Sequence, residues 1–593
     1  MHSKSDLAGS RGQQTRQPNR PVTNLSLLHV VWFFCWQVAC CCLTERETKD
    51  TKSSRLQNYL MGECCLTPRL SPRQCVLACL ERDLEWWRRS SCRRQAPRSK
   101  RSPELDATLC RLRSQGGELK SRVLTNMVVV RSIDGNLSAA VLHDPGDPFG
   151  PSRHWPARAV AVLLQMASLR DRIMDGALPP LPSFVAVINP HDHPQQHART
   201  DWCGLLPLLS NARVQGAQRD LLAPDFSFGA DSYLTNTLSD LGVHASVPTG
   251  WPEARERTYR AGVAAGPFGA RRRVLYWRGG RTHPQRAKYA TALASDVGAA
   301  LRTEAAVAPD VVLCGRHCSR TEGKPTHEWC AHQALLALPG ASFAVGFKYA
   351  LLCGSLVVRG AQAAASCKRC LKEYAQFWHA GLRENEHYVT SHRPSDLPRV
   401  LQRALPPPST ASRDASSSLQ QPPPPPPPSR AAAQNGSGVA SAAAIARRGA
   451  AYTYDVLEPA FILEYWHALL SGYARLHSPR SWGSHPLLSR GSPEAATTFD
   501  GNGQPPISAD ERRCALWHKS GGVARLHATP AVAASDFVPI PSLAALRAES
   551  RTPGGLVRVY RRFAHLLPPR FAGTNASAIA AARRELARWQ GSS

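Results

Sequence analysis

One segment of the chain, residues 274–293, joins a short apolar run to a glycine turn and the start of a helix. The run VLYW at 274–277 is typical of a buried strand, and the Gly-Gly pair that soon follows lets the backbone turn sharply. Pro284 in the first turn, and Thr282 with Gln285 three residues later, predict a helix that begins with a capping box. The segment therefore predicts a strand–turn–helix unit of an α/β fold.

Three arginines, Arg278, Arg281 and Arg286, surround Gly280 in this turn. Guanidinium groups and the free N–H groups at the start of a helix both favour phosphate. The lysine followed by serine or threonine that marks a nucleotide-binding P-loop is missing. On these residues alone, the turn is either a phosphate site or a basic surface turn.

A second segment places an acidic side chain at the end of a strand. FVAVI at residues 184–188 is a continuous apolar run, as in a strand buried on both faces. Ligands of open α/β sheets collect outside the carboxyl ends of strands, so Asp192 lies where a catalytic carboxylate is expected. An aspartate between prolines is also a common turn former, and the local sequence leaves both interpretations open.

Further strands and helices alternate along the chain, which predicts a parallel sheet covered on both faces. We expect a hairpin over residues 127–142, helices over 158–173, 326–338 and 459–476, a helix capped by Ser342, and strands at 311–313 and 355–358. The fold class that these patterns predict is α/β.

The N-terminal part contains an apolar run at residues 25–43, close to the roughly 20 residues that cross a bilayer. Basic residues precede the run, so the positive-inside rule leaves a tail of residues 1–24 in the cytosol and the rest in a lumen. A cleaved signal peptide, followed by secretion, and a buried soluble helix are the alternatives. Residues 44–120 are charged and dotted with cysteines, and we interpret them as a poorly ordered stem.

The formal net charge of +29 would suit a polyanionic partner. The arginines are scattered through Ala- and Pro-rich sequence and no nucleic-acid motif accompanies them, so compositional bias explains the charge and no nucleic-acid partner is expected. The 18 cysteines fit an oxidising lumen. In that compartment Asn136, Asn435 and Asn575 would be glycosylation acceptors.

The spacing of the cysteines and histidines between residues 314 and 332 matches no standard zinc site, so no metal is expected. Cys367 and Cys370 form either a short disulfide or two free thiols. Proline, alanine and serine dominate residues 406–450, which we expect to form an unpacked insert. Residues 478–593 are interpreted as a C-terminal extension of unknown role.

Four blocks of the chain resemble the CAP10-like protein O-glucosyltransferases, glycosyltransferase family 90. That family includes the enzyme that adds glucose or xylose to serines of EGF-like repeats. The blocks are VINPHDHPQ at 187–195, APDFSF at 223–228, RGGRTHPQR at 278–286, and FKYALLCGSLV at 347–357 with His387-Tyr388 downstream. Their order and spacing agree with the family over a domain of residues 121–477.

The resemblance implies a GT-B fold, in which two Rossmann-like halves enclose a cleft. It also implies transfer of glucose or xylose from a UDP-sugar donor to a protein or glycan hydroxyl, with inversion, in the Golgi or endoplasmic reticulum lumen. Asp192 falls on the family's catalytic base. Arg286, with Arg278 and Arg281 beside it, falls on the arginines that hold the donor diphosphate, and such a cluster needs no metal cofactor.

The resemblance also places a nucleotide-holding loop at Ala341, Ser342, Phe343, Gly346 and Lys348, and a disulfide between Cys330 and Cys353. The chain departs from animal members at three donor-binding positions, since Gly280 replaces a serine, Gly346 an arginine and Val247 a tyrosine. These departures leave the identity of the donor sugar open. The acceptor-facing N-terminal part matches the family poorly, so an EGF-repeat acceptor is not carried over. A catalytically inactive relative that binds a glycan or a protein is the alternative function.

Overall fold

The computed structural model describes residues 70–89, 124–143, 155–196, 206–214, 218–229, 251–315, 324–360, 374–405, 441–476, 534–552 and 555–566, with single positions at 105, 108, 109, 112 and 532. The chain divides into a unit of residues 1–58 and a unit of residues 59–593, and the fold described below belongs to the second. The expected membrane segment, residues 25–43, lies outside the described residues. Within the described ranges, no helix is long and apolar enough to cross a bilayer.

The described residues form an α/β fold with two main sheets, one of seven strands and one of five. The five-stranded sheet has the order β12-β10-β9-β7-β8, and every pairing in it is parallel. Its strands are β7 (Arg272–Gly280), β8 (Ala308–Cys314), β9 (His332–Ala337), β10 (Leu356–Gly360) and β12 (Val389–Ser391). The chain enters at β7, moves outward to β8, and then returns to the other side of β7 for β9.

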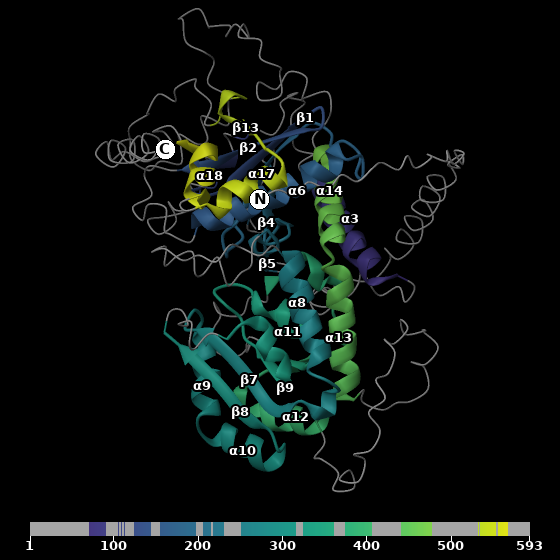
Figure 1. The fold of residues 1–593 in the computed structure, drawn as a ribbon, viewed down its shortest axis with the longest axis vertical. Helices are drawn as coiled ribbons and strands as arrows, with labels where there is room; N and C mark the ends of the chain where they lie inside the picture. Colours follow the sequence, from purple (N-terminus) through teal and green to yellow (C-terminus); the bar gives the residue numbers. More distant parts are fainter. Residues whose placement is uncertain are drawn as a thin grey trace, which may run out of the picture. The chain divides into compact units, whose positions relative to one another are not determined.

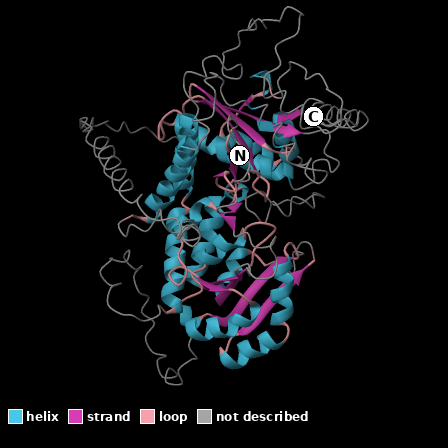
Figure 2. Ribbon diagram, turned by 180° about the vertical axis from the view of Figure 1, so that it is seen from behind, coloured by secondary structure: helices cyan, strands magenta, loops and turns pink. Residues whose placement is uncertain are grey.

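Both faces of the five-stranded sheet are covered, as the predicted alternation of strands and helices requires. Leu275 and Trp277 of β7 point to one face, where they join a cluster with Tyr289 and Leu293, whereas Tyr276 between them joins the cluster on the other face. Figures 1 and 2 show the helices around this sheet. These helices are α8 (Trp251–Ala264), α9 (Pro284–Leu293), α10 (Asp296–Glu304), α11 (Gly346–Leu352), α12 (Leu397–Ala404) and α13 (Ala442–Val456).

The seven-stranded sheet is mixed. Strand β3 (Phe184–Asn189) pairs antiparallel with β1 (Val128–Ile133) and parallel with β4 (Leu208–Ser210), which continues in parallel to β6 (Leu221–Leu222). β1 and β2 (Asn136–His143) form the predicted hairpin. Its two-residue turn has positive φ at Asp134 (50°) and Gly135 (82°), the conformation that an Asp-Gly turn favours. This sheet therefore combines the antiparallel pairs of β1 with the parallel pairs from β3 to β6.

Two long helices link the sheets through a shared hydrophobic core. The predicted helices are confirmed as α6 (Trp155–Met174) and α14 (Pro459–Leu476). Trp466 of α14 is fully buried, and its indole N–H donates to Gln165 of α6 at 2.8 Å. The same core cluster continues to α11 beside the five-stranded sheet, so one core underlies both sheets.

The expected stem is wrong over α3 (Pro72–Arg89), which is an ordered part of the core. Val76, Leu80 and Leu84 recur at four-residue intervals and are buried against α14. Arg73 binds Asp455 at 2.8 Å and also Glu458. Charged and cysteine-rich flanks concealed this amphipathic helix in the sequence.

The predicted boundary between the domain of residues 121–477 and a C-terminal extension is also wrong. Strands β13 (Val538–Pro539) and β14 (Ala564–Leu566) pair with β2, while α17 (Leu543–Arg551) and α18 (Gly555–Phe563) pack against α6. These parts of residues 478–593 therefore complete the seven-stranded sheet and are not an extension outside the fold.

Two smaller expectations differ from the structure. Residues 326–338 form a 3-10 helix (Thr326–Ala331) followed by β9, because the apolar run after His332 pairs with β7 and β10 instead of continuing a helix. The expected insert, residues 406–450, ends earlier than predicted, since α13 begins at Ala442 with Ser441 as its cap. Residues 406–440 lie outside the described part of the chain.

A buried ion pair joins the elements of the two sheets. Lys348 on α11 and Asp225 after β6 have fully buried side chains, and Lys348 Nζ lies 3.2 Å from Asp225 Oδ2. Lys348 also donates to Ser227 Oγ at 2.6 Å, and Gln376 donates to Asp225 at 2.7 Å. Each charge is therefore compensated both by its partner and by neutral hydrogen bonds, as a buried ion pair requires.

Because removal of one partner leaves an uncompensated charge in the core, Lys348→Met should lower the free energy of unfolding by about 3–5 kcal/mol. Urea unfolding followed by tryptophan fluorescence measures the change. Lys288→Met on the exposed side of α9 is the matched control and should stay within about 0.5 kcal/mol of the parent. Equal stability of the two variants would show that the ion pair does not hold the elements together.

Candidate functional site

Asp192 lies just beyond the carboxyl end of β3, as the sequence predicted. Its carboxylate accepts a hydrogen bond from Arg158 Nη1 at 2.6 Å, and the side chain keeps 26% of its surface exposed. Arg158 comes from the first turns of α6, and its guanidinium lies 4.1 Å from the centre of the Phe226 ring. Asp192 is thus held by a cation but remains accessible.

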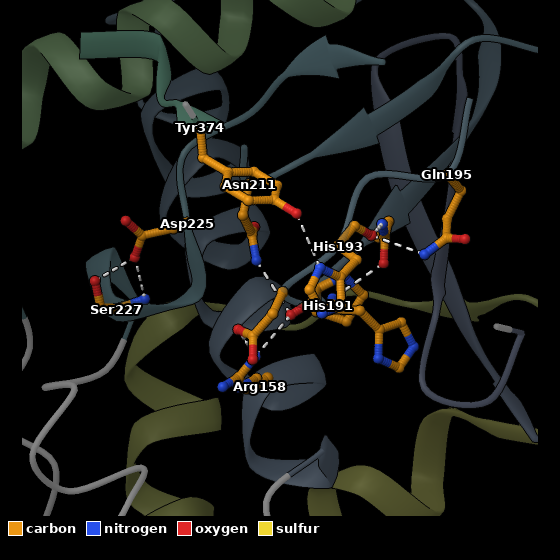
Figure 3. A network of polar contacts seen from close by, with 11 residues as sticks. Arg158, His191, His193, Gln195, Asn211, Asp225, Ser227 and Tyr374 are labelled. Carbon is orange, nitrogen blue, oxygen red and sulfur yellow. Dashed lines mark hydrogen bonds and ion pairs between the residues drawn. The ribbon is translucent and has the colours of Figure 1, made fainter. Parts of the chain in front are cut away.

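Neighbouring hydrogen bonds fix the loop that carries Asp192 (Figure 3). Asn189 accepts from the His191 N–H at 3.0 Å and donates to the His193 carbonyl at 2.9 Å. Asn211 donates to the Pro190 carbonyl at 3.1 Å. A reactive carboxylate on so constrained a loop is positioned before any ligand arrives.

A buried carboxylate, Asp220, secures the far end of the same loop. Asp220 is fully buried and accepts from the backbone N–H groups of Gln195 (3.0 Å) and Gln196 (2.8 Å) and from Ser210 Oγ (2.7 Å). Burial raises the pKa of Asp220, and these hydrogen bonds oppose that rise. Asp220 acts as a positioning residue for the loop.

The charge of Arg158 determines the protonation state of Asp192. Burial raises the pKa of the Asp192 carboxyl, but the charge and hydrogen bond of Arg158 lower it, and the pKa ends below its ordinary value. Burial lowers the pKa of the neighbouring His191 to about 4, so that ring is neutral at pH 7. Asp192 is therefore ionised at neutral pH and can accept a proton.

The arginine turn forms the predicted strand–turn–helix unit, in which β7 ends at Gly280 and α9 begins at Pro284. The predicted capping box is wrong, because the N-cap is His283, whose ring accepts from the Gln285 N–H. Arg278 binds Asp310 of β8 at 2.6 Å, and Arg281 is exposed.

Arg286 ties this turn to the loop after β9. Its guanidinium donates to the carbonyls of Pro339 (2.7 Å), Gly280 (3.0 Å) and Leu338 (3.4 Å). Burial lowers the pKa of Arg286 to about 10, so it stays charged at pH 7. Three of its five N–H groups thus serve the protein backbone.

The position of Arg286 is a topological switch point. The strand order reverses between β7 and β9, because the chain leaves β7 toward β8 and comes back on the other side. In open α/β sheets, ligands bind in the crevice outside the carboxyl ends of the strands at such a point. Gly280 and Ala337 are the last residues of β7 and β9, the two strands at this switch point.

A pocket lies beyond the ends of β9 and β10. Its lining includes Pro339, Ser342, Phe343, Arg359, Tyr374 and His379. A tight loop forms part of the wall, since a Cβ on Gly340 would lie 2.8 Å from the Phe343 carbonyl oxygen and 3.5 Å from Arg286 Nη2. The loop between β9 and α11 is therefore packed directly on Arg286.

Two side chains connect this pocket with the surroundings of Asp192. The Tyr374 hydroxyl lies 3.2 Å from His193 Nδ1, and burial together with the charge of Asp192 raises the pKa of Tyr374 (Figure 3). Phe343 shares a buried cluster with Phe226, the ring that contacts Arg158. The loop between β9 and α11 is thus connected with the surroundings of Asp192 through Phe343 and Tyr374. The pocket lining itself includes neither Asp192 nor Arg286.

The other residues that were expected to bind the donor differ in burial and in their place relative to the pocket. Ser342 and Phe343 are buried in the pocket wall, Ala341 is exposed, and Gly346 begins α11. The ammonium of Lys348 is fully buried and binds Asp225, so it supports the loop between β9 and α11 from inside the protein. Val247 lies outside the described residues.

Sequence reasoning missed Arg158, Asp220, Arg359 and Tyr374. No motif distinguishes these residues, since each reaches the site from an element distant in the sequence. The one signal was their place at a helix start or a strand end, where many residues without a site role also lie. Their roles depend on tertiary structure.

Three cysteines of the described residues between β8 and β10 are in disulfides. Cys330 and Cys353 are joined with an S–S distance of 2.11 Å, and Cys314 is also disulfide-bonded. Among the described residues, no group of histidine, cysteine and acidic side chains is arranged to hold a metal. Asn136 is exposed on the β1–β2 hairpin, whereas Asn435 and Asn575 lie outside the described residues.

Asp220→Ala should loosen the loop that carries Asp192, because the N–H groups of Gln195 and Gln196 lose their acceptors. We expect hydrogen exchange at these two amides to become roughly tenfold faster or more, as for the loss of hydrogen bonds to a charged group. Mass spectrometry of peptides covering residues 190–196 measures the effect. Asp296→Ala on the exposed start of α10 is the control, and unchanged exchange in Asp220→Ala would contradict the positioning role.

Comparison with known proteins does not identify these residues. No protein-family model matches the chain, and no curated protein matches it.

Proposed function

We propose that the chain is an inverting glycosyltransferase that moves a sugar, glucose or xylose, from a UDP-sugar to a hydroxyl of a protein or glycan. The observation that carries the proposal is the pairing of two features. One is an ionised, accessible Asp192 on a fixed loop, and the other is a switch point spanned by Arg286 in a parallel sheet. The first suits a general base, and the second suits a nucleotide.

Asp192 supplies the base in this proposal. The acceptor oxygen attacks the anomeric carbon while Asp192 takes the proton from the same hydroxyl. The bond from the anomeric carbon to the UDP oxygen breaks, and its electron pair leaves with the diphosphate. The attack comes from the side opposite the leaving group, so the configuration at the anomeric carbon is inverted.

The cations around the switch point stabilise the departing diphosphate. Arg286 retains a charge at the end of β7, and Arg281 is exposed in the same turn. Fixed positive groups of this kind stabilise charge that develops in the transition state. No metal is required by the proposal.

A catalytically silent relative that binds a glycan or a protein is the second candidate. The 2.6 Å ion pair between Arg158 and Asp192 favours it, because a carboxylate held in this way is a weaker base. This candidate predicts binding of UDP or of a glycan without turnover.

The proposal includes a lumenal address, with residues 25–43 as the membrane anchor or as a cleaved signal. The disulfides of Cys314 and of Cys330 with Cys353 support an oxidising compartment. Golgi or endoplasmic reticulum lumen is the compartment that we propose.

Asp192→Asn should lower the rate of UDP-sugar hydrolysis by roughly 100- to 10 000-fold, as expected for loss of a general base. The purified lumenal part, residues 44–593, is assayed with UDP-glucose, UDP-xylose and UDP-galactose by release of UDP. Asp296→Asn serves as the control and should keep the parent rate. Binding of a donor without turnover by the parent would support the silent relative, and absence of both binding and turnover would reject the nucleotide-sugar proposal.

Arg158→Gln tests the electrostatic role of the ion pair. The substitution removes the positive charge that lowers the pKa of Asp192, so that pKa should rise. Because the base must be deprotonated, the acidic limb of the kcat/KM profile should move to higher pH. A profile from pH 4 to pH 8 that matches the parent would show that Arg158 does not control the base.

A further inference from the structure

Arg359 is the next-to-last residue of β10 and lines the pocket beyond the carboxyl ends of β9 and β10. Its guanidinium carbon lies 5.8 Å from the centre of the Phe347 ring and 5.7 Å from that of Tyr388. The side chain is half-buried and comes from the strand adjacent to β9, one strand away from the switch point. The rings therefore support a cation at the wall of the pocket.

Within the described part of the lining, Arg359 is the one formally charged side chain. His379 also lines the pocket but is neutral, because burial and then the charges of Arg359 and Lys348 hold its pKa well below the usual range. Phe343, Phe347 and Tyr374 contribute aromatic surface, and Ser342 a hydroxyl. A ligand that fills this pocket meets one positive charge in mostly apolar surroundings.

Arg286, the arginine that the sequence singled out, is not part of the pocket lining. Its guanidinium donates three N–H groups to the carbonyls of the loops after β7 and β9 and holds those loops together. The pocket thus obtains its positive charge from β10 and not from the arginine turn.

We propose that Arg359 binds the diphosphate of the nucleotide donor and that the pocket beside it holds the reacting end of that donor. Tyr374 lines the same pocket and reaches His193 beside Asp192, so a donor with its diphosphate at Arg359 directs its anomeric carbon toward the base. Charge that develops on the leaving oxygen is then stabilised by Arg359. The inference rests on the proposed function and assigns it a residue from outside the arginine turn.

Binding of UDP and of uridine to the purified lumenal part, measured by isothermal titration calorimetry, tests this role. Arg359→Gln should weaken UDP binding by roughly tenfold or more, the usual effect of losing a hydrogen bond between charged groups. Uridine lacks the diphosphate, so its affinity should stay the same. Arg359→Lys should recover part of the UDP affinity, and Arg302→Gln on the exposed face of α10 should leave both affinities unchanged.

The outcomes separate this inference from the proposed function. If the parent protein binds UDP and Arg359→Gln binds it equally well, the assignment of Arg359 is wrong while the nucleotide-sugar proposal stands. If the parent protein does not bind UDP, both are rejected. Equal weakening of UDP and uridine would show that Arg359 shapes the pocket without contacting the diphosphate, which also overturns the inference.

Discussion

The buried ion pair of Lys348 and Asp225 is the interaction on which the arrangement of the site depends. Asp225 belongs to the segment that follows β6 of the seven-stranded sheet, and Lys348 belongs to α11, which follows the pocket loop. Two charges without solvent tolerate little change in their separation, since the Coulomb energy in a low-dielectric interior rises steeply as they move apart. The pocket loop and the elements next to Asp192 are therefore held at a fixed separation by two fully buried side chains.

Other charged residues near the site also support its structure. Arg286 holds two loops through backbone carbonyls, Asp220 holds the loop of Asp192, and Arg158 sets the charge of the carboxylate. Each of these groups is polar and largely enclosed, which costs desolvation energy that only a complete set of partners offsets. A site built in this way loses little conformational entropy when a ligand binds, because its side chains are already fixed.

The sequence predicted those parts of the fold that depend on local patterns. The hairpin at Asp134-Gly135, the buried strand before Asp192 and the unit from β7 to α9 all have periodicity or turn chemistry within about 20 residues. The predictions for helix α3 and for the strand that begins at His332 were wrong, because both elements are stabilised by distant parts of the chain. Helix α3 packs against α14, and the strand pairs with β7 and β10. Lys348 was expected to contact the donor because it lies in a matching motif, but a motif does not show whether a side chain is buried. Arg158 and Arg359 were missed because their contacts come only from tertiary structure.

The C-terminal strands add a constraint on the order in which the chain can be assembled. β13 and β14 cover the outer edge of β2, and Ala564 pairs with Val141, which lies 423 positions earlier (564 − 141). At a synthesis rate of about 5–20 residues per second, roughly 20–85 seconds pass between these two residues. During that interval β2 presents unpaired N–H and C=O groups along its outer edge, the kind of surface that templates association between chains. The sheet of this protein therefore stays incomplete at the edge of β2 for a long part of translation.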